Sequence, residues 1–582
     1  MLLSALKALS EERDRLPHCY TDQRVGYRID LDRQGRLVSF VPVERDAPSL
    51  AIPYITRTSK PVPLPVDKGD YVLGEHSLNA DARTKEKDVL QARKRHRLWR
   101  YLIGEMFDAT RVDELRAVMS FADSVQAETI VLPESFNQKE FIAIYVDSVY
   151  FPEDPRIQAW WKERQLGSDG SDAAPSQCSV CGQSTEVVET IPIQVRGLSN
   201  IGGKSGMALV SGNKSVFERH GLKRAIGASV CAPCGEATHQ ALNALVADPT
   251  RSRHIGNSKL LWWTTEPIDD FIGALLAGDT DESVGHVFDA VLSGHLVPSV
   301  DSARFFAVTI GANVNRVVVR GWLDMTLKDA ITNAKNWIER VTVADQRADG
   351  VRRPGVKAMV NSLAPPGSGR PSSRVAPGVI DDVLRSALTA TRLPYRVLAA
   401  CLGRIRAEQG KVTFARAALL SAYLSQLDNK EVPIMSELNE RGLDPAFTCG
   451  RLLCLLDQAS RLATSPKNSL IDRSYAAAST MPALTFPRLL RLNRAHIGKL
   501  KRDKPGAAYR IEQGMEDLMG TLDNFPRTLS SGEQGRFALG LYNQQASDRA
   551  AARAAKARKS ASSEEMFVDD VDSTEAATES EE

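Results

Sequence analysis

Two pairs of cysteines have the residue type and the spacing that bind a metal ion. Cys178 and Cys181 form one CxxC pair, and Cys231 and Cys234 form a second. Each two-residue gap allows a tight turn to present both sulfurs to one ion, and four thiolates satisfy the tetrahedral preference of Zn²⁺. Because four thiolates leave no open coordination position for a substrate, the predicted zinc site is structural. The alternative is four buried or free thiols, since cysteine packs well in cores.

A glycine-rich segment between the two cysteine pairs carries a lysine and a serine. It resembles the end of a phosphate-binding P-loop, but that motif needs a glycine where this chain has Leu198, and the residues that follow favour a strand rather than a helix. The sequence therefore argues against NTP hydrolysis. Glycines still allow close approach to a nucleic-acid backbone. The predicted contacts in and after this segment are Lys204, Ser205, Gly206, Asn213 and Lys214.

Basic side chains cluster in three further segments. Residues 85–108 have apolar residues at helical spacing and a basic opposite face, residues 58–65 are rich in proline, and residues 316–320 are a predicted strand. Backbone phosphates attract such charges and supply most of the sequence-independent affinity. For the helix, the alternative is a solvated outer face. The candidate contacts in or beside these segments are Arg57, Lys60, Arg93, Lys94, Arg95, Arg97, Arg316 and Arg320.

Motifs of common enzymes do not occur in the chain. The histidines form no HExxH or HxH pattern, and there is no GxSxG motif, no paired-carboxylate motif and no dinucleotide-binding fingerprint. We therefore predict no catalytic site, although catalytic residues can be scattered along a sequence.

Length and composition indicate a large protein that lies in the cytoplasm. A chain of 582 residues exceeds what one hydrophobic core holds, so about two to four domains are expected. The net charge is +2, so any nucleic-acid surface must be local. The first residues lack the basic and apolar regions of a signal peptide, and no apolar run is long enough to span a membrane. With eight cysteines in this length, the CxxC pairs suggest metal binding rather than disulfides.

The pattern along the chain predicts an α+β fold: a mixed N-terminal part with strands and a zinc-knuckle insertion, followed by an all-helical C-terminal bundle. Strand-like runs occur at 27–31, 37–43, 129–146, 186–217, and at 305–309 and 316–320, and residues 365–373 are the clearest linker. Ser530 and Glu533 form a capping box before the last predicted helix. The predicted domains are an N-terminal α+β domain (1–125), a β-rich domain with the zinc site (126–335), a linker with a helical segment (336–434), a helical bundle (435–548) and a charged, disordered tail (549–582).

Several segments, taken in order, resemble the large-subunit family of the type I-C CRISPR surveillance (Cascade) complex. The opening MLLSALKAL is similar to that family's first helix, and GGKSGMALVSGNKSVFERHG at 202–221 is similar to its glycine/serine loop and following elements. ANVNRVVVR at 312–320 resembles a strand of the family, and the segment from Phe525 to Gln544 resembles its C-terminus. Gly212, Leu541 and Asn543 depart from the family's pattern. The resemblance covers about residues 1–545, and the acidic tail lies outside it.

This resemblance implies a binding role without catalysis. Base pairing with the guide RNA reads the target, whereas the large subunit reads the protospacer-adjacent motif and helps to open the duplex. The implied partners are guide RNA, double-stranded target DNA with its displaced strand, the backbone and guide-processing subunits of Cascade, and a helicase-nuclease; no membrane is involved. The 1–125 domain is the candidate reader of the adjacent motif. The alternatives are a metal-dependent nuclease with unrecognised carboxylates and a zinc-containing protein-interaction scaffold.

The resemblance also implies a second product of the same gene. In this family a small subunit is made by internal translation, and the 435–548 bundle with Met435 as its start fits that role. A small subunit lines nucleic-acid strands and needs a basic face. The residues that supply this face are Arg488, Arg491, Arg494, Lys499, Lys501 and Arg502.

Overall fold

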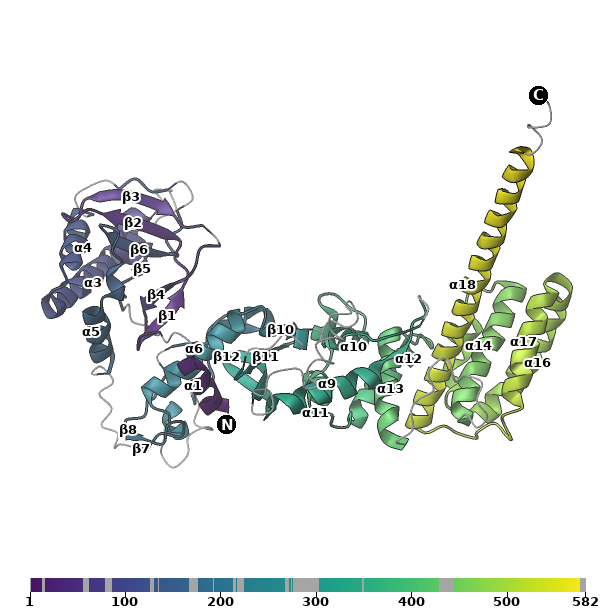
Figure 1. The fold of residues 1–582 in the computed structure, drawn as a ribbon. Helices are drawn as coiled ribbons and strands as arrows, with labels where there is room; N and C mark the ends of the chain where they lie inside the picture. The colour runs from purple at the N-terminus through teal and green to yellow at the C-terminus, as the bar shows by residue number, and fades with distance from the viewer. Residues whose placement is uncertain are drawn as a thin grey trace, which may run out of the picture. The chain divides into compact units, whose positions relative to one another are not determined.

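The computed structural model of the chain forms two compact units (Figure 1). The first unit comprises residues 1–252 and 311–318, and the second comprises 253–310 and 319–582. Within the part of the chain described below, no helix is long and apolar enough to cross a membrane. The structure describes residues 2–12, 16–44, 46–55, 62–78, 86–125, 130–133, 136–166, 176–191, 193–212, 216, 224–266, 272–273, 275, 303–347, 350–428 and 444–575.

The first unit contains a four-stranded sheet in the order β3-β2-β6-β5, with helices packed against it. The alternation that predicts a strand at 27–31 is confirmed, because Tyr27, Ile29 and Leu31 are all buried. β2 runs antiparallel to β3 and parallel to β6. The elements are β2 (Tyr27–Leu31), β3 (Leu37–Pro42), β5 (Asp67–Lys68), β6 (Phe141–Val146), α3 (Glu86–Thr110), α4 (Asp113–Ser124) and α5 (Pro155–Leu166).

The rest of the first unit is organised around one helix, α6 (Ala232–Ala247), which is buried on nearly all sides. Little regular structure surrounds it, so the strand-rich pattern predicted for 129–146 and 186–217 is only partly correct. Among the described residues of these segments, strands are confined to β6 and β9. The other elements of this part are α1 (Leu2–Glu12), β1 (Tyr20–Gln23), β4 (Leu50–Pro53), β7 (Ser176–Gln177), β8 (Ser184–Thr185) and β9 (Gly203–Ala208).

The second unit begins with β10 (Ser252–Ile255), β11 (Ser258–Thr264) and the two ends of the long strand β12 (Arg304–Thr326), whose middle, residues 311–318, belongs to the first unit. β12 covers both strands predicted at 305–309 and 316–320, and its two ends lie side by side. The Phe306 ring stacks on Trp322 with centroids 5.8 Å apart, and Arg304 forms an ion pair with Asp324. Val314, between these ends, has a positive φ of 55°. β12 therefore doubles back near this residue.

Apart from the antiparallel pair β13 (Val343–Ala344) and β14 (Val351–Arg352), the described remainder of the second unit is helical, which confirms the predicted fold class. One continuous core joins residues from Ile255 to Ala546, and it includes the sheet and both halves of the helical region. The helices are α9 (Leu327–Val341), α10 (Val356–Ser362), α11 (Pro377–Thr389), α12 (Tyr395–Ala407), α13 (Phe414–Asp428), α14 (Pro445–Thr464), α15 (Leu470–Ala478), α16 (Pro482–Asp503), α17 (Pro505–Met519) and α18 (Ser531–Glu575).

The segment predicted as a linker is a defined loop. The guanidinium of Arg374 donates hydrogen bonds to the backbone carbonyls of Pro365, Ser368 and Gly369, at 2.7–3.1 Å. One side chain therefore closes the proline- and glycine-rich stretch on itself. The predicted domain boundaries within the helical region stay predictions, and Met435 lies outside the described residues.

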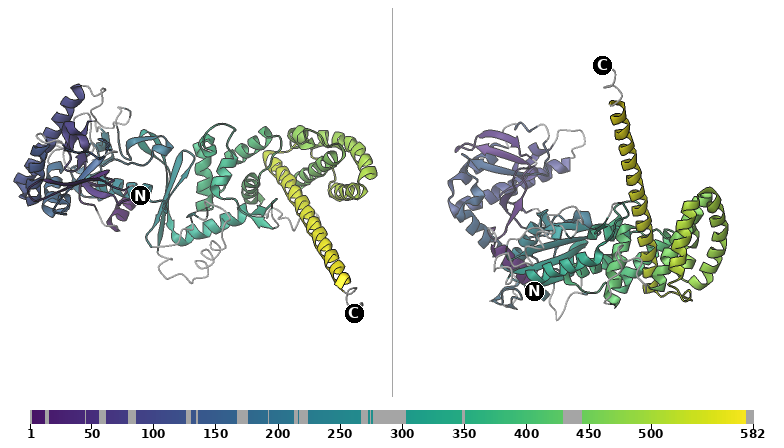
Figure 2. Two further views of the ribbon diagram at one scale, coloured as in Figure 1. Left: turned by 90° about the horizontal axis from the view of Figure 1, so that it is seen from above. Right: turned by 45° about the vertical axis from the view of Figure 1, so that its right-hand side comes forward.

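Helix α18 begins at the predicted capping box and runs further than expected. The Ser530 N–H donates to the Glu533 carboxylate at 2.7 Å, and the Glu533 N–H donates back to the Ser530 hydroxyl at 3.4 Å. The structure then places residues 549–575 in the same helix, where the sequence pattern predicts disorder. Alanine, arginine, lysine and glutamate dominate this stretch and have high helix propensity, which favours continuation of the helix. Both views of Figure 2 show α18 as one uninterrupted helix.

Candidate metal centre and basic surfaces

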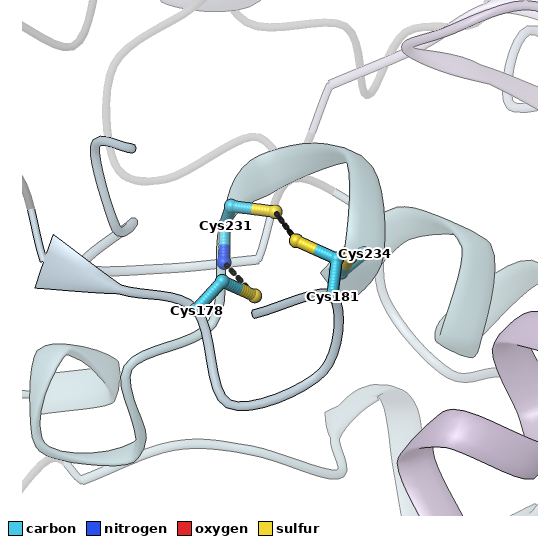
Figure 3. Close-up of side chains that lie close together, drawn as sticks. All are labelled: Cys178, Cys181, Cys231 and Cys234. Atoms are coloured by element: carbon cyan, nitrogen blue, oxygen red, sulfur yellow. Dashed lines mark hydrogen bonds between the residues drawn. The ribbon is translucent and has the colours of Figure 1, made fainter. Parts of the chain in front are cut away.

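The four predicted metal ligands come together in the first unit (Figure 3). Cys178 and Cys181 lie in the turn between β7 and β8, where Gly182 takes a positive φ of 75°. Cys231 is the N-cap residue of α6 and Cys234 lies in the first turn of that helix. The four sulfurs lie within 4.8 Å of one another. The structure therefore builds the CxxC pairs into one cluster, as predicted.

The surroundings of this cluster fit a Zn²⁺ ion. Backbone N–H groups of Val180 and Cys231 point at the Cys178 sulfur, at 3.5 and 3.4 Å. Burial alone would raise the pKa of the Cys178 thiol, but hydrogen bonds from backbone N–H groups, first that of Cys181, outweigh it and lower this pKa to about 6. Burial raises the pKa of Cys234. Thiolates packed this closely require a compensating cation, and all four cysteines are free of disulfides.

Three polar side chains of α6, which belong to no sequence motif, hold the surrounding chain in place. The Glu236 carboxylate accepts hydrogen bonds from the Cys19 N–H at 3.0 Å and lies 2.6 Å from His18 Nδ1. Gln240 donates to the Tyr20 carbonyl at 2.8 Å, and Asn243 accepts from the Arg196 N–H at 2.9 Å. Glu236, Gln240 and Asn243 follow helical spacing in a mostly apolar helix, and that spacing was the available sequence signal.

The glycine-rich segment is an extended strand, β9, rather than an open phosphate-binding loop. The end of the Gln194 side chain lies over Gly206 and occupies the space where a Cβ atom would stand. β9 pairs in parallel with β12, with Gly203 opposite Val314 and Ala208 opposite Arg316. The structure therefore brings the glycine-rich strand next to Arg316, two candidate contacts that lie far apart in the sequence. Asn213 and Lys214 lie outside the described residues, and only the backbone of Lys204 and Ser205 is described.

Acidic partners occupy part of the basic face of α3. Arg93 forms an ion pair with Glu75 at 2.7 Å, and Arg95 forms one with Asp70 at 2.5 Å. Lys94 and Arg97 are exposed and form no ion pair with any described residue. Arg320 is also engaged, since its guanidinium donates to the Ser258 hydroxyl at 2.5 Å. Arg57 and Lys60 lie outside the described residues.

A stripe of unpaired basic residues lies on α16 in the second unit. Five basic side chains are exposed and form no ion pair with any described residue, whereas Lys501 pairs with Glu512 at 2.9 Å. Asp503 is the one acid in the sequence of α16. Four of the five recur at helical spacing, so they share one face of the helix. The five residues, called the α16 basic face below, are Arg488, Arg491, Arg494, Lys499 and Arg502.

Comparison with known proteins identifies the family. A family model described as CRISPR-associated protein (Cas_Csd1) matches residues 2–548, which spans both units and stops where the charged end of α18 begins. No curated protein sequence matches the chain. Because the family model covers nearly the whole length, this chain belongs to the Cas_Csd1 family of CRISPR-associated proteins.

Proposed function

We propose that this protein is the non-catalytic large subunit of a type I-C Cascade complex and that it binds guide RNA and target DNA in antiviral defence. The α16 basic face carries the nucleic-acid part of this proposal. Its five cations stand exposed and have no acidic partner within the described chain, so they keep their attraction for phosphates and release counterions when they bind. The paired Arg93 and Arg95 of α3 must first give up Glu75 and Asp70, which makes them weaker contacts.

The metal centre supports a structural role for zinc in this proposal. Four cysteine ligands close the coordination sphere of one ion and leave no position for a substrate. Zinc would hold the turn between β7 and β8 to the start of α6, and binding energy at such sites is folding energy. The four cysteines would therefore stabilise the fold of the surrounding chain rather than catalyse a reaction.

The finer roles follow from the proposed subunit identity. The sheet-containing N-terminal part would read the protospacer-adjacent motif and aid duplex opening, with Lys94 and Arg97 as its exposed basic contacts. β9 and Arg316 would form a second contact region. The backbone and guide-processing subunits and the helicase-nuclease would be its protein partners, and its location would be the cytoplasm.

A charge-matched pair of variants tests the nucleic-acid surface. Binding of the full-length protein to labelled RNA, single-stranded DNA and double-stranded DNA is measured by fluorescence anisotropy over a range of salt. Substituting Arg488, Arg491 and Lys499 together with alanine should weaken binding and reduce the salt slope by about 0.9 for each phosphate of duplex DNA that the protein no longer neutralises. The control replaces three exposed arginines that pair with aspartates, Arg33, Arg111 and Arg156.

The outcomes separate the alternatives. Equally weakened binding in both triple variants would show that total charge, not the α16 basic face, decides binding. Cleavage of DNA with Mg²⁺ or Mn²⁺ would favour the metal-dependent nuclease. If the protein shows no cleavage and no salt-dependent binding, the result would favour the protein-interaction scaffold.

We also propose that a small subunit starts at Met435. In the full chain, a Cβ atom added at Gly535 of α18 would lie 3.5–3.6 Å from the side chains of Leu398, Leu420 and Leu424 of α12 and α13, so these leucines cover this face of the helix. A product that begins at Met435 lacks these leucines, so this face of α18 would be free for another subunit. Expression with a C-terminal tag should yield both products. A single full-length product, together with normal assembly after silent changes around codon 435, would contradict this idea.

A further inference from the structure

The N-terminal helix α1 lies against the metal-bearing helix α6 (Figure 1). Leu6 and Leu9 of α1 are buried, which fixes one face of α1 on the body of the first unit. At its start, Leu3 packs against the apolar cluster formed by the metal-binding cysteines and Val230. An apolar side chain over the thiolates limits the access of water to them. α1 therefore covers part of the cysteine cluster, although nothing in its own sequence binds metal.

The first turn of α6 lacks a capping side chain. Cys231 occupies the N-cap position but makes no side-chain capping hydrogen bond. A helix start without a cap leaves backbone N–H groups unsatisfied and frays. Ligation of Cys231 and Cys234 to one ion would clamp this turn in place of a cap. A bound metal would then stabilise the start of α6, the helix against which α1 packs.

A second tie joins α6 to the residues that follow α1. The Glu236 carboxylate accepts from the Cys19 N–H at 3.0 Å and from the Cys19 thiol at 3.2 Å, and Cys19 has a positive φ of 59°. A non-glycine residue in this conformation is strained and persists because its neighbours hold it. Glu236 lies two residues beyond Cys234. The same helical segment therefore anchors both α1 and the turn at Cys19.

From these contacts we propose that α1 is a functional part of the metal centre. Leu3 shields the thiolates, while the metal holds the helix on which α1 docks. Docking of α1 and metal binding then stabilise each other, because linkage between two binding events is reciprocal. The inference concerns the metal centre alone and would hold for a chain that binds no nucleic acid.

Hydrogen exchange tests the first direction of this coupling. Full-length protein is compared with and without chelation of its metal, and peptides from 2–12, 176–185 and 231–247 are followed by mass spectrometry. Removing the metal should speed exchange in α1 by at least about tenfold along with exchange in the knuckle and α6. Peptides from α14 serve as the internal control and should not change. Unchanged protection of α1 while the knuckle exchanges faster would overturn the proposal.

Metal affinity tests the reverse direction. Leu3→Ala should weaken zinc binding by about 10–100-fold in competition with a chromophoric chelator, the range for residues that support metal ligands from outside. Ser4→Ala, on the exposed side of α1, is the control and should keep the wild-type affinity. Wild-type affinity in Leu3→Ala, or purified protein without bound zinc, would refute the proposal.

Discussion

Two regions of this protein are held together in opposite ways. Around α6 in the first unit, the chain has short strands and irregular segments, and a cluster of four cysteines joins pieces that are distant in sequence. Where α14 crosses α18 in the second unit, Gly450 and Gly540 allow the two backbones to touch, and beside this contact the Arg451 guanidinium donates a hydrogen bond to Gln544 at 2.9 Å. A Cβ atom on Gly450 would overlap the Phe537 carbonyl, and one on Gly540 would overlap the Phe447 carbonyl.

The difference follows from how much apolar surface each region can bury. The apolar cluster at the cysteines contains only Cys178, Val230, Cys231 and Cys234, with three partly buried neighbours, among the residues that the structure describes. The core of the second unit extends from Ile255 to Ala546. A small cluster cannot offset the entropy of ordering its loops, so metal ligation supplies what packing lacks. A continuous core needs no metal link, because closely packed side chains define the positions of its helices.

The largest effect is expected at the metal centre. Cys231→Ser removes one of four ligands, and structural zinc sites supply about 10–16 kcal/mol of binding energy that is coupled to folding. Zinc content should fall well below one per chain, and amide protection should be lost in α6. The second unit should keep its own transition in calorimetry. If the calorimetric transitions of both units were lost together, the second unit would also depend on the metal, which would contradict the comparison.

Glycine substitutions at the helix crossing should have the next largest effect. Gly450→Ala should destabilise the second unit by about 1–3 kcal/mol, because the new methyl group forces the two backbones apart. Gly498→Ala on α16 is the matched control, since a Cβ atom there meets no atom within 4 Å. The control should be neutral or stabilising by up to about 1 kcal/mol. Urea denaturation compares the two, and equal effects would contradict the close crossing.

A polar network within the second unit sharpens the comparison further. Hydrogen bonds from Arg416, and then from Arg404, hold the pKa of Glu408 at about 2, below its ordinary value. A depressed pKa adds stability to the folded state above about pH 4.3, the ordinary pKa of glutamate. This added stability is lost as the pH falls towards 2. Glu408→Gln should therefore cost about 1–3 kcal/mol at pH 7.

The matched control for this variant is Glu339→Gln at an exposed position of α9. It should change stability by less than about 0.5 kcal/mol. Denaturant midpoints at pH 7 and pH 3 supply the measurement. The gap between Glu408→Gln and the wild type should shrink at the lower pH, and a gap that stays constant would contradict the role of the Glu408 charge.

The smallest effect is expected at the end of α18. Truncation after Asp548 removes Arg549 and Arg553, whose guanidinium groups donate hydrogen bonds to Gln346. The core ends at Ala546, so the stability should fall by about 1 kcal/mol or less. Thermal denaturation of the truncated chain measures this change. A larger change would show that the tail, and not the core alone, holds the second unit together.

Local patterns in the sequence predicted much of the fold. Alternation at Tyr27–Leu31, the amphipathic pattern of residues 85–108 and the capping box at Ser530 and Glu533 each matched an element in the structure. The CxxC pairs matched one cluster. For residues 549–575, charge segregation in the sequence predicts disorder, whereas the structure continues α18 through them, as their helix propensity favours.

The sequence by itself determined which residues can bind a metal or a phosphate, because residue type and local spacing are written along the chain. Only the tertiary structure decided which of them are available. Acidic partners from α2 (Gly69–Val72) and η1 (Gly74–Ser77) engage Arg95 and Arg93, while the α16 basic face has no ion-pair partner in the described parts of the chain. Likewise, α1 reaches the cysteines only through packing on α6. Such neighbours depend on long-range contacts, which no local pattern of residues specifies.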